Sequence, residues 1–176
     1  MEYQPIIKTQ RLILRPFGLE DCTQVELLAG DIRVADVTAH IPHPYPDGLA
    51  REWISSHGQT WKDKTLVAYA IIIAETDLLI GCISLMNIEN LEAELGYWVG
   101  VKHWGNGYCT EACTELVKFG IENFGLVRFY AYHLTRNPAS GKVLMKSGFS
   151  HIGSGKSIFG FRSLEESIEQ YELKTA

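Results

Sequence analysis

The chain has 176 residues, of which 46% are hydrophobic, and carries a formal net charge of −5 at neutral pH. Because this is the size of one compact domain, we expect a single domain over residues 1–176. The acidic balance and the absence of Lys- and Arg-rich runs argue against a nucleic-acid-binding surface. No window of about 18 apolar residues predicts a membrane span, so we expect a cytoplasmic protein with no membrane contact.

The N-terminal half of the sequence predicts one strand, two helices and a meander. Alternation over residues 11–17 indicates the first strand, and residues 19–29 have the spacing of a short helix. Three prolines make residues 41–46 a loop, after which Asp47 is placed to cap a second helix that reaches toward Trp61. Three strand-like runs then predict antiparallel neighbours, over residues 66–74, 79–86 and 93–99.

The C-terminal half begins with an amphipathic helix. Apolar positions at helical spacing run from Cys109 to Phe124, and Gly125 is suited to end the helix. Residues 127–134 predict a strand, so the strand-helix-strand order favours a right-handed parallel crossover. Asn137 is positioned to cap a last helix, which Pro138 opens and Gly148 closes. Two further strands complete the sheet, over residues 149–159 and 167–173.

Metal-binding patterns are absent from the sequence. Four cysteines show no Cys-x-x-Cys or similar spacing and read as buried apolar residues or isolated thiols: Cys22, Cys82, Cys109 and Cys113. His40, His43 and Tyr45 cluster in the proline-rich loop, but no helical His spacing or companion carboxylate accompanies them. We therefore predict loop packing there and no metal.

The turn before the amphipathic helix predicts an anion site. Gly105 and Gly107 lie just before or inside the first helical turn, where unpaired N–H groups and the helix dipole attract phosphate. A dinucleotide fold is excluded, because Thr110 stands where a third glycine is needed and the next strand carries no carboxylate. Gly155-Lys156-Ser157 resembles the end of a P-loop, but position 150 is Ser rather than the required Gly.

Four segments together resemble the GNAT N-acetyltransferases, in particular the Rim-type ribosomal-protein N-terminal and spermidine acetyltransferase subgroup. They are residues 9–17 (TQRLILRPF), 94–99 (ELGYWV), 104–112 (WGNGYCTEA) and the pair 137–140 (NPAS) and 146–149 (KSGF). The resemblance implies an α+β GNAT fold: a mixed, mostly antiparallel sheet of six to seven strands. About four helices cover its two faces, and a central parallel strand pair splays apart. Two residues depart from the wider family: Trp104 stands where many relatives have Gln or Arg, and Cys109 stands where Gly or Ala is usual.

The resemblance also implies acetyl-CoA as co-substrate. Backbone groups of the turn and first helical turn are expected to bind its pyrophosphate: Gly105, Asn106, Gly107, Tyr108, Cys109 and Thr110. The splayed strand would offer N–H groups to the thioester and pantetheine at Trp98, Val99 and Gly100. Asn137 has two competing roles, as helix cap or as a contact to the pantetheine arm.

Acetyl transfer to an amine needs a base, because such amines are mostly protonated at neutral pH. Glu94 shares a strand face with Gly96 and Trp98 and is the first candidate, with Glu92 of the same parity in reserve. Ser140, one helical turn from Asn137, matches the serine that the subgroup uses to assist thiolate departure.

The sequence thus predicts an acetyl-CoA-dependent N-acetyltransferase acting by direct transfer through a ternary complex. The first candidate acceptor is a protein N-terminal α-amine, and the second is a small amine such as a polyamine, amino acid or antibiotic. A non-catalytic coenzyme A-binding protein is the alternative class, but it would need neither Glu94 nor Ser140. The loops at residues 30–50 and 155–165 set the acceptor, and monomer and homodimer both stay open.

Overall fold

The computed structural model describes residues 3–158 and 165–175. These residues form an eight-stranded sheet in the order β1-β2-β3-β4-β5-β6-β8-β7, in which β5 and β6 are parallel and the other neighbours antiparallel. The strands are β1 (Ile7–Lys8), β2 (Leu12–Arg15), β3 (Leu66–Ile73), β4 (Leu78–Glu89), β5 (Glu92–Val99), β6 (Arg128–Leu134), β7 (Ser150–Ser157) and β8 (Glu166–Lys174). The α-helices are α1 (Cys22–Ala29), α2 (Ile32–Ala35), α3 (Leu49–Asp63), α4 (Tyr108–Phe124) and α5 (Pro138–Lys146). Short 3-10 turns occupy Leu19–Asp21 and Val101–His103.

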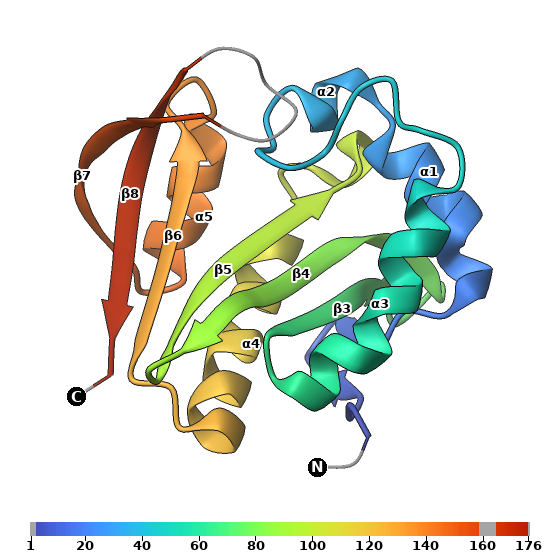
Figure 1. The fold of residues 1–176 in the computed structure, drawn as a ribbon, viewed down its shortest axis with the longest axis horizontal. Coiled ribbons are helices and arrows are strands. Elements are labelled where there is room, and N and C mark those ends of the chain that lie inside the picture. The colour runs from blue at the N-terminus through green and yellow to red at the C-terminus, as the bar shows by residue number, and fades with distance from the viewer. Residues whose placement is uncertain (1–2, 159–164, 176) are drawn as a thin grey trace.

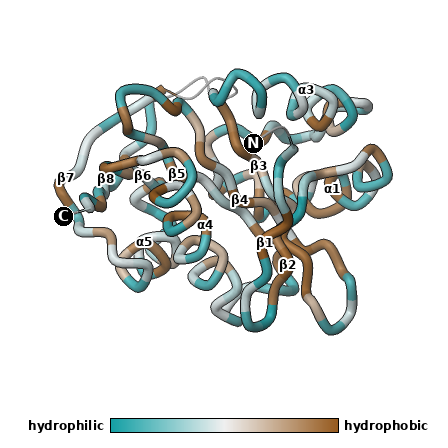
Figure 2. Tube along the Cα trace, turned by 90° about the horizontal axis from the view of Figure 1, so that it is seen from below, coloured by the Kyte–Doolittle hydropathy of each residue, from teal (hydrophilic) through white to brown (hydrophobic). Residues whose placement is uncertain are grey.

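Helices cover both faces of the sheet. In Figure 1, α4 and α5 lie behind the strands, whereas α3 lies in front of β3 and β4 and α1 lies on the same side. The main apolar core packs α4 and α5 against the sheet around Leu85, Leu116 and Phe129. A smaller core lies under α1 and α3 around Val25 and Ile54. The central strands are accordingly brown in Figure 2, and teal residues recur along α3.

Helix α4 forms as its apolar periodicity predicts. Gly107 is its N-cap at φ 78° and Gly125 its C-cap at φ 65°, both in the left-handed region that glycine adopts without strain. Ala112, Cys113 and Leu116 are fully buried against the sheet. The amphipathic helix, its closing glycine and the parallel crossover to β6 are therefore confirmed.

Other expectations are corrected by the structure. The described sheet has eight strands rather than six or seven, because two-residue β1 pairs with β2 and is too short to leave a periodic pattern. Four-residue α2 was likewise not predicted. Asp47 does not cap α3, since Gly48 occupies the N-cap position at φ 79°. Strand β7 begins at Ser150, one residue after its predicted start, and residue 159, its predicted end, lies outside the described residues.

The parallel pair at the centre of the sheet separates. Strands β5 and β6 are paired only at Glu92–Arg128, Ala93–Phe129 and Glu94–Tyr130. Beyond Glu94, β5 continues beside β4 and diverges from β6, and the gap widens toward the carboxyl end of β5 (Figure 1). The predicted splay is thus present, and the residues of β5 after Glu94 have one edge without a strand neighbour.

Candidate active site

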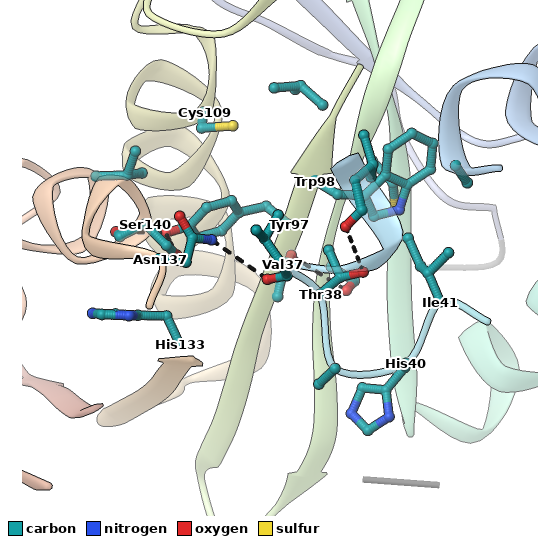
Figure 3. A pocket seen from close by; sticks show the side chains of 18 of the residues that line it. Val37, Thr38, His40, Ile41, Tyr97, Trp98, Cys109, His133, Asn137 and Ser140 are labelled. Atoms are coloured by element: carbon teal, nitrogen blue, oxygen red, sulfur yellow. Dashed lines mark hydrogen bonds between the residues drawn. The ribbon is translucent and has the colours of Figure 1, made fainter. Parts of the chain in front are cut away.

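A cavity of about 760 Å³ opens where β5 and β6 diverge. Helices α4 and α5 line one side of it, and α1, α3 and residues 34–45 line the other. In Figure 3, Tyr97 reaches toward Ser140 and Asn137, while Trp98 lies on the opposite side of β5 with Ile41. Alternation along β5 therefore divides the cavity into two halves.

The N-terminus of α4 faces the first half. The first helical hydrogen bond runs from Glu111 N–H to the carbonyl of Gly107 at 3.1 Å. Because a helix supplies no internal acceptors for its first N–H groups, those of Tyr108, Cys109 and Thr110 point out of the helix end. All three residues line the cavity together with Gly105 and Gly107, so the predicted anion cradle borders it.

Arg11, the residue before β2, holds the turn at the start of α4 in place. Its Nη1 donates to the carbonyl of Asn106 at 3.0 Å, and its Nε donates to Glu111 Oε2 at 2.7 Å. The guanidinium also lies 4.9 Å from the ring centre of Tyr108. Asn106 itself does not line the cavity, and its side chain donates to the carbonyl of Trp104.

Hydrogen bonds from Thr9 and Arg11 lower the pKa of the Glu111 carboxyl, although burial opposes the shift. Glu111 is therefore charged at neutral pH, which suits its place in the first turn of a helix. This anchor could not be predicted from local patterns, because Arg11 and Glu111 are 100 residues apart.

The three expected backbone donors of β5 are not equivalent. The N–H of Gly100 donates to the carbonyl of Ile80 at 2.8 Å, so the expectation that it is available to a ligand is wrong. In an antiparallel ladder the direction of the N–H groups alternates, so that of Trp98 points toward β4 as well. The N–H groups of Val99 and Tyr97 then face the open edge. The carbonyl of Val99 also faces that way and accepts a bond from Trp104 Nε1 at 2.8 Å.

The two candidate bases have different surroundings. Glu94 lines the cavity, and its Oε2 accepts a hydrogen bond of 2.9 Å from Asn87 Nδ2. Glu92 is not among the lining residues and forms an ion pair of 2.7 Å with Arg128. Geometry therefore favours Glu94 as the carboxylate available to a bound amine.

Tyr132 connects Glu94 to the loop after α2. Its hydroxyl lies 3.1 Å from His40 Nε2. Burial, the charge of Glu94 and a hydrogen bond to that carboxylate raise the pKa of Tyr132, which keeps the phenol protonated. Tyr132 therefore lies between the Glu94 carboxylate, which borders the cavity, and the exposed side chain of His40.

Ser140 lies on α5 at the junction of the two strands and lines the cavity. Its hydroxyl oxygen is 2.8 Å from the hydroxyl of Tyr97, which also donates to the Ser140 carbonyl at 2.9 Å. Burial raises the pKa of Tyr97 well above its usual value, so the phenol is neutral. Ser140 is thus a hydroxyl positioned by a second, buried hydroxyl.

Asn137 occupies the N-cap position of α5 with Pro138 in the first turn, as predicted, but its side chain does not cap the helix. No side-chain capping bond forms, and Nδ2 instead donates to the carbonyl of Val37 at 3.4 Å, drawn as a dashed line in Figure 3. The side-chain amide is turned toward the loop after α2. Asn137 also lines the cavity, and its contact to the pantetheine arm stays a prediction.

The remaining walls carry thiols and cations. Burial raises the pKa of the Cys109 thiol to about 12, so the thiol stays protonated beside the cradle. Lys142 and Lys146 lie one turn apart on the exposed side of α5 and also line the cavity. Among residues 3–158 and 165–175, no group of three or more His, Cys, Asp or Glu side chains could hold a metal ion. All four cysteines are free.

A family model described as an acetyltransferase (GNAT) domain matches residues 11–150. The chain belongs to the GNAT acetyltransferases. An uncharacterized N-acetyltransferase of Bacillus licheniformis, p20, is 32% identical over 149 residues, 82% of each chain. The ribosomal-protein-serine acetyltransferase of Escherichia coli is 36% identical over 84 residues, 47% of each chain.

Solved structures agree on the fold. RimL, a ribosomal L7/L12 alpha-N-protein acetyltransferase in complex with coenzyme A, superposes with a TM-score of 0.85 at 18% identity, covering 97% of this chain and 98% of its own. The structural likeness supports the fold, whereas the family model and the sequence relatives support an N-acetyltransferase of the Rim-type GNAT subgroup. No helix within the described part of the chain is long and apolar enough to cross a membrane.

In this GNAT acetyltransferase, two tyrosines and two lysines border the cavity but were not among the site residues predicted from the sequence. They are Tyr97, Tyr132, Lys142 and Lys146. The alternation of side chains along a strand could have indicated Tyr97, because a residue next to Trp98 points to the other face of the sheet, where α4 and α5 lie. Tyr132 is two residues beyond the register partner of Glu94, which only the strand pairing reveals.

Proposed function

We propose that the protein transfers the acetyl group of acetyl-CoA to a primary amine bound in the same cavity, with a protein N-terminal α-amine as the acceptor. The observation that carries the proposal is the early separation of β5 from β6. It opens one cavity bordered by the α4 helix end on one side and by a carboxylate, Glu94, on the other. The two reactants would meet at the exposed edge of β5.

Cofactor binding is assigned to backbone groups and two lysines. N–H groups from Gly105 to Thr110 would hold the pyrophosphate, helped by the positive end of the α4 dipole. The open edge at Val99 would donate to the thioester carbonyl, whose oxygen gains negative charge when the amine attacks. Lys142 and Lys146 at the exposed side of α5 are suited to the remaining phosphate charge.

Glu94 is proposed as the general base, acting directly or through a water. It would take a proton from the ammonium, whose pKa is about 8 for an α-amine. The amine nitrogen then forms a bond to the acetyl carbon, and the carbon–sulfur bond breaks. The hydroxyl of Ser140 would hydrogen-bond the departing thiolate, or protonate it and regain a proton from solvent, and the attacking nitrogen loses its second proton to solvent to give the amide.

A protein N-terminus is the proposed acceptor because the relatives include a ribosomal-protein-serine acetyltransferase and the fold matches an alpha-N-protein acetyltransferase. The four free cysteines agree with our proposal that the protein works in the cytoplasm. A small-molecule amine would use the same chemistry with a different fit to the loops.

A screen of peptides and small amines, with release of free coenzyme A thiol as the measurement, tests the proposal. Transfer to at least one amine, lost in the Glu94→Gln variant, is the expected result. Binding of acetyl-CoA without transfer to any amine would contradict it and indicate a coenzyme A-binding protein.

A further inference from the structure

The half of the cavity opposite α4 and α5 has an apolar wall. We call the following six residues the acceptor wall: Val25, Ile41, Tyr45, Cys82, Trp53 and Trp98. Val25 and Cys82 are buried, at 1% and 3% exposure. The other four are partly exposed, so their apolar surfaces face the cavity. They pack against the small core under α1 and α3, which fixes the wall in place.

The negative charge in this cavity is limited to one group. Among the described residues that line the cavity, Glu94 is the only carboxylate, and the lysines Lys142 and Lys146 lie on α5. Residues 159–164, which the structure does not describe, contain Arg162 and no Asp or Glu. An acceptor with one ammonium group can therefore be neutralised at Glu94. Each additional ammonium placed along the acceptor wall would lose part of its hydration, and no second carboxylate among the described lining residues would compensate that loss.

We propose that the acceptor is an amine with a single positive charge attached to an uncharged apolar or aromatic group. The ammonium would lie at Glu94 and the apolar group against Trp98 and Ile41. This inference rests on the proposed acetyl transfer and names its substrate class. Two kinds of acceptor have this combination of one charge and one apolar group: a peptide whose first residue is apolar, and a free aromatic monoamine. A polyamine carries several charges and no such group.

Four acceptors at subsaturating concentration distinguish the classes: a peptide that begins with Phe, the same peptide beginning with Asp, 2-phenylethylamine and spermidine. From the surface buried by a phenyl group, we expect kcat/KM for a phenyl-bearing acceptor to exceed that for spermidine by about tenfold or more. Preference for the Phe peptide over 2-phenylethylamine, or the reverse, supports the inference and identifies the source of the amine.

A charge introduced on the wall provides a gain-of-function test. Ile41→Asp should raise kcat/KM for spermidine and lower it for the phenyl-bearing acceptor. Ile6→Asp is the matched control, because Ile6 is 60% exposed and does not line the cavity. This variant should discriminate between spermidine and the phenyl-bearing acceptor as the original protein does. Circular dichroism is the check that both variants are folded.

Spermidine turned over as well as or better than the phenyl-bearing acceptors would overturn this inference and leave acetyl transfer standing. Unchanged selectivity in folded Ile41→Asp would overturn the placement of the apolar group. Absence of transfer to every amine, with acetyl-CoA still bound, would overturn the proposed function and this inference with it.

Discussion

The hydroxyl oxygens of Tyr97 and Ser140 lie 2.8 Å apart at the point where the central strands separate. The Tyr97 hydrogen is directed to the Ser140 carbonyl at 2.9 Å, so the Ser140 hydroxyl is left to donate to the phenolic oxygen. To assist a departing thiolate, Ser140 must exchange this neutral acceptor for a charged one. Bonds to charged groups are stronger, so the exchange is favourable when negative charge develops on sulfur.

Ser140→Ala should lower kcat about tenfold or more while acetyl-CoA affinity changes little, because the lost bond strengthens only as sulfur becomes charged. Tyr97→Phe should also lower kcat, through the orientation of Ser140. The two changes together should then cost no more than Ser140→Ala alone. Single-turnover kinetics on the two single variants and the double variant measure this coupling, and additive losses would show that Tyr97 does not act through Ser140.

Gly107→Val should weaken acetyl-CoA binding by about 2 kcal/mol or more, because a β-branched residue is strained at φ 78° and crowds the cradle. Gly125→Val is the matched control: it introduces the same strain at φ 65° at the other end of α4, and Gly125 is not a lining residue. Calorimetry should show weaker binding only for Gly107→Val. Equal affinities in two folded variants would remove the cradle from the binding site.

Glu94→Gln should lower kcat/KM by roughly 10²-fold, and higher pH should restore part of the loss by supplying neutral amine. Glu92→Gln breaks the 2.7 Å ion pair with Arg128 outside the cavity, so it should alter stability slightly and leave kcat/KM near the original value. A pH profile of both variants makes the comparison. The opposite pattern would move the base to Glu92.

His57 on α3 should make the fold sensitive to acid. Its ring is packed against Phe17 and Trp53, neither ring nitrogen has a hydrogen-bond partner in the described structure, and burial lowers its pKa to about 4. The unfolded chain protonates near pH 6.5, so stability falls as the pH drops from 6.5 toward 4, by roughly 3 kcal/mol in total. Denaturant unfolding at several pH values should show a smaller drop for His57→Leu, and an identical drop would exclude His57 as its source.

Local patterns predicted the regular elements well, because they depend on periodicity and turn residues. The apolar spacing of α4, its closing glycine and the antiparallel meander were all predicted from the sequence. Glu94 and Ser140 were chosen from strand parity and from resemblance to the family, and both line the cavity. Their chemical roles stay predictions.

The failures concern contacts between distant segments. Asn137 is at the N-cap position as predicted, but its side chain makes no capping bond, and its Nδ2 donates to the carbonyl of Val37, 100 residues away in sequence. Gly100 lost its expected role because the pairing of β4 with β5 decides which N–H groups are used. Arg11 was overlooked because its contacts to Asn106 and Glu111 exist only once β2 lies beside the start of α4.

The open edge of β5 has a consequence for how the site tolerates mutation. Donors that belong to the main chain are present whatever side chain the residue carries, so ordinary substitutions at Val99 alter the shape of the site but keep its N–H group. Proline is the exception, since it has no N–H. In a paired strand that loss would also break a rung of the sheet, but the N–H of Val99 faces away from β4 and has no strand partner. At this position, unlike at its neighbours on either side, proline would remove the N–H that we propose as a donor to the thioester and leave the ladder intact.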